Sequence, residues 1–166
     1  MRRLMVILTV LLCGGCSGGQ PPPDAPPDDP EAQAVLAVVR QFFDTMRSRD
    51  ADGARATLVV EGQFNSIRPA ETGVTVRTTP LASYLEGLGA DTRLQEERMW
   101  DPVVMVDEQV AMVWAPYDFH RDGELSHCGI DVFSLVRTGE GWKITGVTYS
   151  VEPDGCERLG QPNRQP

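Results

Sequence analysis

The chain has 166 residues, of which 15 are basic and 24 are acidic, so its formal net charge at neutral pH is −9. The first 15 residues hold two arginines and no acid, and the remaining 13 basic and 24 acidic residues give −11. A domain this acidic repels nucleic-acid phosphates, and the chain has no basic patch for anionic lipids, so we expect neither kind of partner.

The N-terminus has the layout of an export signal. Arg2 and Arg3 precede the apolar stretch LMVILTVLLCGGC, which ends at Cys16. A basic start, a short apolar run and small residues are typical of secretory signals, and the run is too short to cross a bilayer, which needs about 20 residues. Its end resembles the lipobox of bacterial lipoproteins. We therefore expect a signal peptide at 1–15, lipidation of Cys16, and a location in the bacterial cell envelope with membrane contact through the lipid only.

The next segment, residues 16–30, is rich in proline and almost free of apolar side chains. Such a segment cannot bury a core and is expected to form an extended tether. The remainder has the size of one ordinary domain. We assign this domain to residues 31–156 and expect a disordered tail at 157–166.

Three helices are predicted before residue 90. The first covers 31–49, because Asp29 can cap it, Pro30 suits a first turn, and apolar residues recur three or four apart. A second helix is predicted near 51–58 and a third from Thr79-Pro80 to about Leu88, with Thr79 as its cap. Short strands at 62–67 and 74–78 lie between the second and third helices.

From residue 92 the pattern changes to strands. They are predicted near 94–100, 103–106, 110–120, 125–137 and 142–151, with turn residues between them. Helices followed by a run of antiparallel strands predict an α+β fold with the helices on one face of a curved sheet.

Three segments carry a resemblance to a known superfamily: VAMVWAPYDF, SHCGIDVFSLVR and GWKITGVTY. Together with the amphipathic first helix and the Thr79-Pro80 helix, they resemble the NTF2-like (SnoaL-like) proteins, and within these the lumazine-binding-like group. The resemblance covers about 31–152 and implies a cone of three helices on a curved antiparallel sheet. The superfamily includes ketosteroid isomerases, dehydratases, epoxide hydrolases, polyketide cyclases and members without known activity, so the fold alone assigns no chemistry.

Two-residue turns at Asp122-Gly123 and Gly139-Glu140 set an expected register for the last three strands. Without bulges, this register assigns side chains to two faces of the sheet. On the helix-covered face it predicts a ligand pocket of Tyr117, Ile130, Val132, Ser134, Val147 and Tyr149. On the other face it places Trp114, Asp118, His127, Asp131 and Phe133.

Two interpretations of His127 follow. With Asp118 or Asp131 it could form a general-base pair, because imidazole titrates near neutrality and a carboxylate can orient it. Alternatively, these residues form a polar cluster on the outer face, or part of a homodimer interface through the sheet with Trp114 and Phe133. The position of the ketosteroid-isomerase oxyanion acid, counted back without gaps, falls at Ser134. Serine is no buried carboxylic acid, which disfavours that mechanism.

The cysteines outside the signal and the lipidation position are Cys128 and Cys156. In an oxidising compartment we expect them to form a disulfide, worth about 3 kcal/mol in the chain-entropy model. Two cysteines and two histidines without metal-ligand spacing predict no metal site, and we expect no cofactor.

The sequence favours an exported domain that binds a small apolar ligand or a protein partner without catalysis. It contains no metal motif, nucleophile elbow or phosphate-binding glycine loop. The alternative is an envelope enzyme of the isomerase, dehydratase or hydrolase type that uses a His127–Asp pair. Convergence of His127 with an aspartate inside a closed pocket would favour the enzyme.

Overall fold

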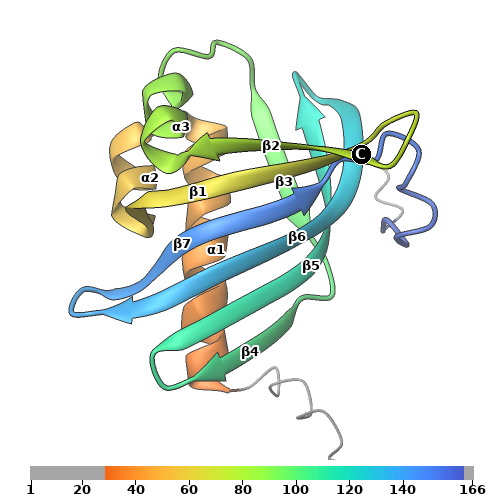
Figure 1. Cartoon of the computed structure of the whole chain (residues 1–166). Coiled ribbons are helices and arrows are strands. Elements are labelled where there is room, and N and C mark those ends of the chain that lie inside the picture. Colours follow the sequence, from red (N-terminus) through yellow and green to blue (C-terminus); the bar gives the residue numbers. More distant parts are fainter. Residues whose placement is uncertain (1–28, 163–166) are drawn as a thin grey trace, which may run out of the picture.

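The computed structural model of the chain describes residues 29–162 (Figure 1). The predicted signal peptide, most of the tether and Cys16 lie outside the described residues, as do 163–166. The elements, in chain order, are α1 (Pro30–Ser48), α2 (Ala51–Thr57), β1 (Leu58–Pro69), β2 (Val74–Pro80), α3 (Leu81–Leu88), β3 (Gln95–Met99), β4 (Val103–Asp107), β5 (Val110–Arg121), β6 (Glu124–Thr138) and β7 (Gly141–Ser150).

The predicted α+β class is confirmed. The strands form one curved sheet in the order β2-β1-β7-β6-β5-β3, with β4 also paired to β5. Strands β1 and β7 run parallel, whereas the other pairs are antiparallel, so the sheet is mixed rather than wholly antiparallel. A parallel pair needs a long connection between its strands. Here the connection from β1 to β7 includes α3 and the whole β3–β6 meander.

Helix α1 covers one face of the sheet, and Figure 1 shows it crossing behind the strands. The Asp29 carboxylate accepts a hydrogen bond from the Glu31 amide at 3.0 Å, as predicted for an N-cap, and Arg49 ends the helix in a left-handed conformation. The buried face of the helix consists of Ala32, Val35, Leu36, Val39, Phe42, Phe43, Thr45 and Met46. Among the described residues, seven of the 23 buried residues of the hydrophobic core come from this stripe, which packs against the sheet.

The prediction for the start of α3 was wrong. Thr79 belongs to β2, where it pairs with Phe64, and Pro80 is the N-cap without a side-chain hydrogen bond. The β1–β2 ladder extends through Pro80, so strand pairing outcompetes the capping function of Thr79. The helix then packs Leu81, Leu85 and Leu88 into the core.

Two β-bulges change the predicted register. Both hairpin turns are as expected, with Arg121 opposite Glu124 and Thr138 opposite Gly141. However, Ser126 is an extra residue on β6 and Thr145 an extra residue on β7, so the pairing slips by one beyond each bulge. A one-residue slip moves every later side chain to the other face of the sheet. The predicted faces were therefore inverted over much of β6.

Pro116 lies on β5 between the stretches that pair with β4 and with β3, where its carbonyl accepts a hydrogen bond from the Trp100 amide at 3.1 Å. Strand β4 pairs with β5 as far as Trp114, and strand β3 pairs from Tyr117 onward. A proline, which lacks an amide proton, leaves no donor unpaired in this gap.

The C-terminal segment packs across the outer face of the sheet. The predicted disulfide between Cys128 and Cys156 is present, with a Cα–Cα distance of 5.1 Å. The Trp100 Nε1 donates to the Leu159 carbonyl at 3.1 Å, and the Gln161 Nε2 donates to Asp118 at 2.8 Å. Residues 157–162, expected to be part of a disordered tail, are thus held against the domain. Among residues 29–162, no helix has the length and apolar character needed to cross a membrane.

Candidate functional site

A cavity of about 230 Å³ lies between α1, α3 and the inner face of the sheet. Its size is below the range of about 300–1,000 Å³ that is typical of drug-sized ligands, so it suits a molecule of one or two rings. The lining is mainly aromatic and apolar, with a few polar groups. It consists of Phe42, Met46, Phe64, Arg68, Tyr84, Gln95, Glu97, Tyr117, Phe119, Arg121, His127, Asp131, Phe133, Val147 and Tyr149.

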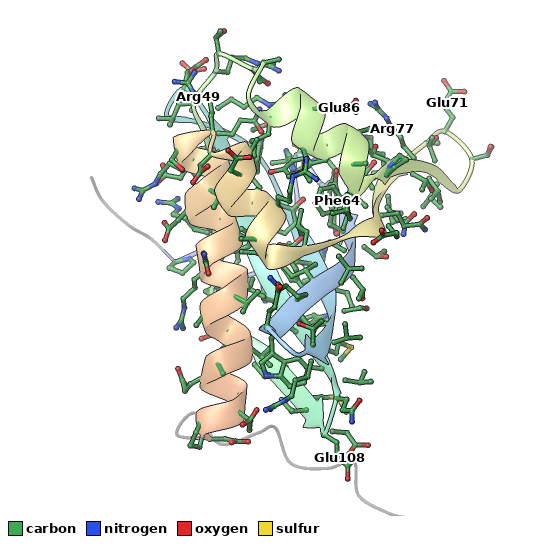
Figure 2. All side chains as sticks on the ribbon, turned by 90° about the vertical axis from the view of Figure 1, so that its left-hand side faces the viewer. Arg49, Phe64, Glu71, Arg77, Glu86 and Glu108 are labelled. Atoms are coloured by element: carbon green, nitrogen blue, oxygen red, sulfur yellow. A yellow bond between two sulfur atoms is a disulfide. The ribbon has the colours of Figure 1, made fainter. Side chains whose placement is uncertain are left out.

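Aromatic rings from three elements form one wall of this cavity. The ring centroids of Phe42 on α1 and Phe64 on β1 are 5.9 Å apart, and that of Tyr84 on α3 is 4.8 Å from Phe64 in an edge-to-face arrangement. Figure 2 shows Phe64 beneath helix α3. Edge-to-face pairs add stabilisation beyond their buried area, so the wall is preorganised for an apolar ligand.

The bulges decide which predicted pocket residues reach the cavity. Of the six residues predicted for a ligand pocket, Tyr117, Val147 and Tyr149 line this cavity. Ile130, Val132 and Ser134 lie on the opposite face of β6, because the slip at Ser126 reverses the strand; Ser134 is exposed to solvent. The same slip brings the other face of the strand into the domain, and this face carries His127, Asp131 and Phe133.

His127 is held as a neutral side chain by two hydroxyl groups. The Tyr117 hydroxyl donates to the Ser150 carbonyl at 2.7 Å, so its oxygen accepts from His127 Nε2 at 3.1 Å. Nδ1 then accepts from the Ser126 hydroxyl, also at 3.1 Å. Burial, with the nearby positive charges of Arg68 and Arg121, lowers the pKa of His127 to about 4.

Asp131 forms a carboxyl pair with Glu97 inside the cavity. Asp131 is 2% exposed, and burial together with the neighbouring Glu97 raises its pKa well above the ordinary aspartate value. Burial likewise raises the pKa of Glu97 to about 7, although the hydrogen bond from Asp131 opposes this shift. The two buried carboxyls titrate as a pair, and burial favours the protonated form of Asp131, which can donate a hydrogen bond to Glu97.

Two polar atoms of the lining have no hydrogen-bond partner among the described residues. They are the hydroxyl oxygen of Tyr84 and Oδ2 of Asp131, and both are buried. An unpaired buried polar group costs about 1–3 kcal/mol, so such groups are normally satisfied. Both residues line the cavity.

Asp118 lies on the opposite face of the sheet, away from His127. Arg98 donates two hydrogen bonds to its carboxylate, at 2.9 and 2.8 Å. Burial raises the pKa of Asp118, but the hydrogen bonds from Arg98 and Gln161 outweigh it, so the net pKa is lowered. The predicted pairing of His127 with Asp118 is wrong, because the bulge at Ser126 separates the two residues onto different faces.

The expected dimer surface also changes. Trp114 lies on the outer face and is 38% exposed, but Phe133, its expected partner, is 1% exposed and packs in the core against Phe42 and Phe43. A homodimer through the outer face stays a prediction.

The ketosteroid-isomerase comparison needs the same correction. Counting without gaps placed the buried acid at Ser134, but the bulge at Thr145 shifts the strands, and Ser134 is exposed. The carboxylic acid that burial keeps neutral in this chain is Asp131. The argument against a neutral buried acid therefore does not hold.

Sequence reasoning missed Glu97 and Tyr84. Glu97 stands in QEERM, whose polar run is typical of an exposed strand, and only its pairing with Phe119 places it at the cavity. The third predicted helix carried a signal for Tyr84, since this residue stands three residues after Leu81 and one before Leu85, close to the buried stripe. Within residues 29–162, no three His, Cys, Asp or Glu side chains are grouped to hold a metal ion.

No protein-family model matches the chain, and no curated protein matches it. Solved structures do. An NTF2-like protein from Cytophaga hutchinsonii is similar with a TM-score of 0.60 and 10% identity, over 72% of this chain and 96% of that one. The chain has an NTF2-like fold.

Two further structures agree with the NTF2-like fold. An NTF2-like protein with a cystatin-like fold from Novosphingobium aromaticivorans has a TM-score of 0.56 and 14% identity, over 81% of this chain and 90% of that one. An NTF2-like protein of unknown function from Shewanella baltica has a TM-score of 0.54 and 12% identity, over 74% and 94%. At these identities the likeness shows the fold alone, and function must be argued from the site.

Proposed function

We propose that this NTF2-like domain binds a small ligand, mainly apolar and carrying a hydroxyl group, in the cavity between α1, α3 and the sheet. The observation that carries this proposal is the pair of buried, unpartnered polar atoms on Tyr84 and Asp131 in an otherwise aromatic cavity. A ligand hydroxyl can accept from the Tyr84 hydroxyl and donate to Asp131 Oδ2. Binding would then recover the free energy that the two unpaired groups cost the empty domain.

The aromatic wall supports the apolar part of the ligand. Phe42, Phe64 and Phe133 present ring surface to the cavity, and burying a ligand ring against them stabilises the complex in proportion to the apolar area removed from water. The hydrogen-bonding groups then fix the orientation, as in most small-molecule sites.

Isothermal titration of the purified chain with two neutral probes tests this function. 4-Hydroxycinnamyl alcohol carries a phenol that cinnamyl alcohol lacks, and we expect it to bind about tenfold more tightly, through hydrogen bonds to Tyr84 and Asp131. Val147→Phe narrows the cavity and should abolish binding. Thr148→Phe, one residue away on the exposed face, is the matched control.

Failure of both alcohols to bind, or equal binding to Val147→Phe, would overturn the proposal. Because a larger side chain in the core can unfold the domain, the melting temperature of each variant is compared first. Tyr84→Phe provides the second variant, since it removes one oxygen without adding volume. It should weaken the phenol probe and leave cinnamyl alcohol unchanged.

A second function, proton transfer on a bound carbonyl compound, is favoured by the Asp131–Glu97 pair. A neutral Asp131 can donate a hydrogen bond to a developing oxyanion once its proton turns from Glu97 to the bound compound. Glu97, with a pKa of about 7, is then free to act as a base near neutral pH. Exchange of the α-hydrogens of 1-indanone in deuterated buffer, followed by NMR, tests this function. Exchange no faster than in buffer, or unchanged in Glu97→Gln, would exclude it.

We further propose that the chain is exported and anchored through lipid on Cys16. The Cys128–Cys156 disulfide supports export, because disulfides persist mainly in oxidising compartments outside the cytoplasm. Labelling of the expressing cells with a palmitate analogue tests the anchor. Incorporation should be lost in Cys16→Ala, and labelling that survives this change would contradict lipidation at Cys16.

A further inference from the structure

Two exposed arginines, from the outer strands β1 and β5 of a four-strand stretch of the sheet, line the cavity. Arg68 is the penultimate residue of β1 and Arg121 the last residue of β5. The register places both strand ends at the same end of the sheet, since Ile67 pairs with Ser150 of β7 and Phe119 pairs with His127 of β6. Both side chains line the cavity and are exposed, whereas Asp131 lies buried.

Neither guanidinium has a carboxylate partner among the described residues. Arg121 lies over the Phe119 ring at 5.4 Å from the centroid, and Arg68 makes no ion pair within residues 29–162, whereas Arg93, Arg98 and Arg158 each pair with an acid. Other arginines of the described residues, such as Arg55 and Arg77, also lack a carboxylate partner; Arg68 and Arg121 differ from these in that both line the same cavity.

The kinds of group that line the cavity therefore change from its rim to its inside. Positive charge lies at the rim, aromatic rings form the wall, and a neutral acid and the Tyr84 hydroxyl lie inside. An anion placed inside would meet the Glu97–Asp131 pair, whereas an anion at the rim would meet two guanidinium groups, which bind carboxylates in bidentate geometry.

From this order we propose that the ligand is a hydroxylated aryl carboxylate. Its carboxylate lies between Arg68 and Arg121, and its hydroxyl reaches Tyr84 and Asp131. The inference rests on the proposed binding function and adds the charge and the orientation of the ligand. Its predictions concern the rim alone, so its test can fail while the cavity remains a binding site.

The test compares 4-hydroxycinnamate with 4-hydroxycinnamyl alcohol, which has the same ring and phenol but no charge. Titration calorimetry at low salt should show the carboxylate binding about tenfold more tightly, and this advantage should shrink at high salt because exposed charges are screened. The Arg68→Gln/Arg121→Gln double variant should bind both probes equally. Arg77→Gln, an exposed arginine on β2 outside the cavity (Figure 2), should behave as the unaltered chain.

Each other outcome decides a different point. Equal affinity for the two probes, or an advantage of the carboxylate that survives the double variant, overturns the assignment of the anion to the rim and leaves the cavity as a site for neutral ligands. Absence of binding by the alcohol as well overturns the proposed function, and with it this inference.

Discussion

Glu97 and His127 lie in the same cavity, and their pKa values move in opposite directions. Burial raises the pKa of Glu97 from 4.5 to about 7. Burial, together with Arg68 and Arg121, lowers the pKa of His127 from 6.5 to about 4. Each shift disfavours the charged form of its group in the folded state, so each links folding to pH.

The sign of the linkage differs between the two groups. Between pH 4.5 and 7 the native state holds a proton on Glu97 that the unfolded chain has released, so stability falls as pH rises. Between pH 4 and 6.5 the unfolded chain binds a proton on His127 that the native state does not, so stability rises with pH. Each change amounts to about 3 kcal/mol, and the two largely cancel in the unaltered chain.

Single variants should reveal the two opposing contributions to stability, measured by urea unfolding between about pH 4 and pH 8. The free energy of unfolding of Glu97→Gln, relative to that of the unaltered chain, should increase by about 3 kcal/mol as the pH rises to 8. For His127→Gln the same difference should increase by about as much as the pH falls from 7 to 4. Glu86→Gln, on the exposed surface of α3 (Figure 2), is the control and should give a flat difference. Differences for Glu97→Gln and His127→Gln that are also flat would mean that neither group changes its pKa on folding.

Three more predictions concern the site and its supports. Tyr84→Phe removes a buried hydroxyl without a partner, so it should raise the unfolding free energy by about 1 kcal/mol while weakening 4-hydroxycinnamyl alcohol binding; a loss of stability in urea would contradict this. In the Cys128→Ser/Cys156→Ser variant the free energy of unfolding should fall by about 3 kcal/mol. An unfolding midpoint equal to that of the unaltered chain would count against a formed disulfide. Arg98→Ala leaves the buried Asp118 without its main partner and should cost about 2 kcal/mol in urea unfolding, with unchanged probe affinity in calorimetry because the pair lies on the outer face.

The helices, the turns and the disulfide could be predicted from the sequence because each depends on local chemistry. Asp29 and the apolar spacing define α1, and the Asp122-Gly123 pair defines its hairpin, with both residues at positive φ. The parallel pairing of β1 with β7 could not be predicted this way, since it depends on contacts between distant segments.

The candidate site was predicted only in part, because its composition depends on two bulges that carry no strong local signal. Ser126 and Thr145 are ordinary strand residues, yet each shifts the pairing by one. That slip brought His127 and Asp131 inward and turned Ser134 outward. Glu97 lines the cavity because it pairs with Phe119. The polar residues around it in the sequence give no sign of this position.

The central claim, that the cavity holds a small hydroxylated aromatic ligand, is tested most directly by NMR of the complex with 4-hydroxycinnamate. We expect intermolecular nuclear Overhauser effects from the probe ring to Phe42, Phe64 and Tyr84. Effects confined to outer-face residues such as Trp114, or none at a probe concentration that saturates the calorimetric titration, would contradict it.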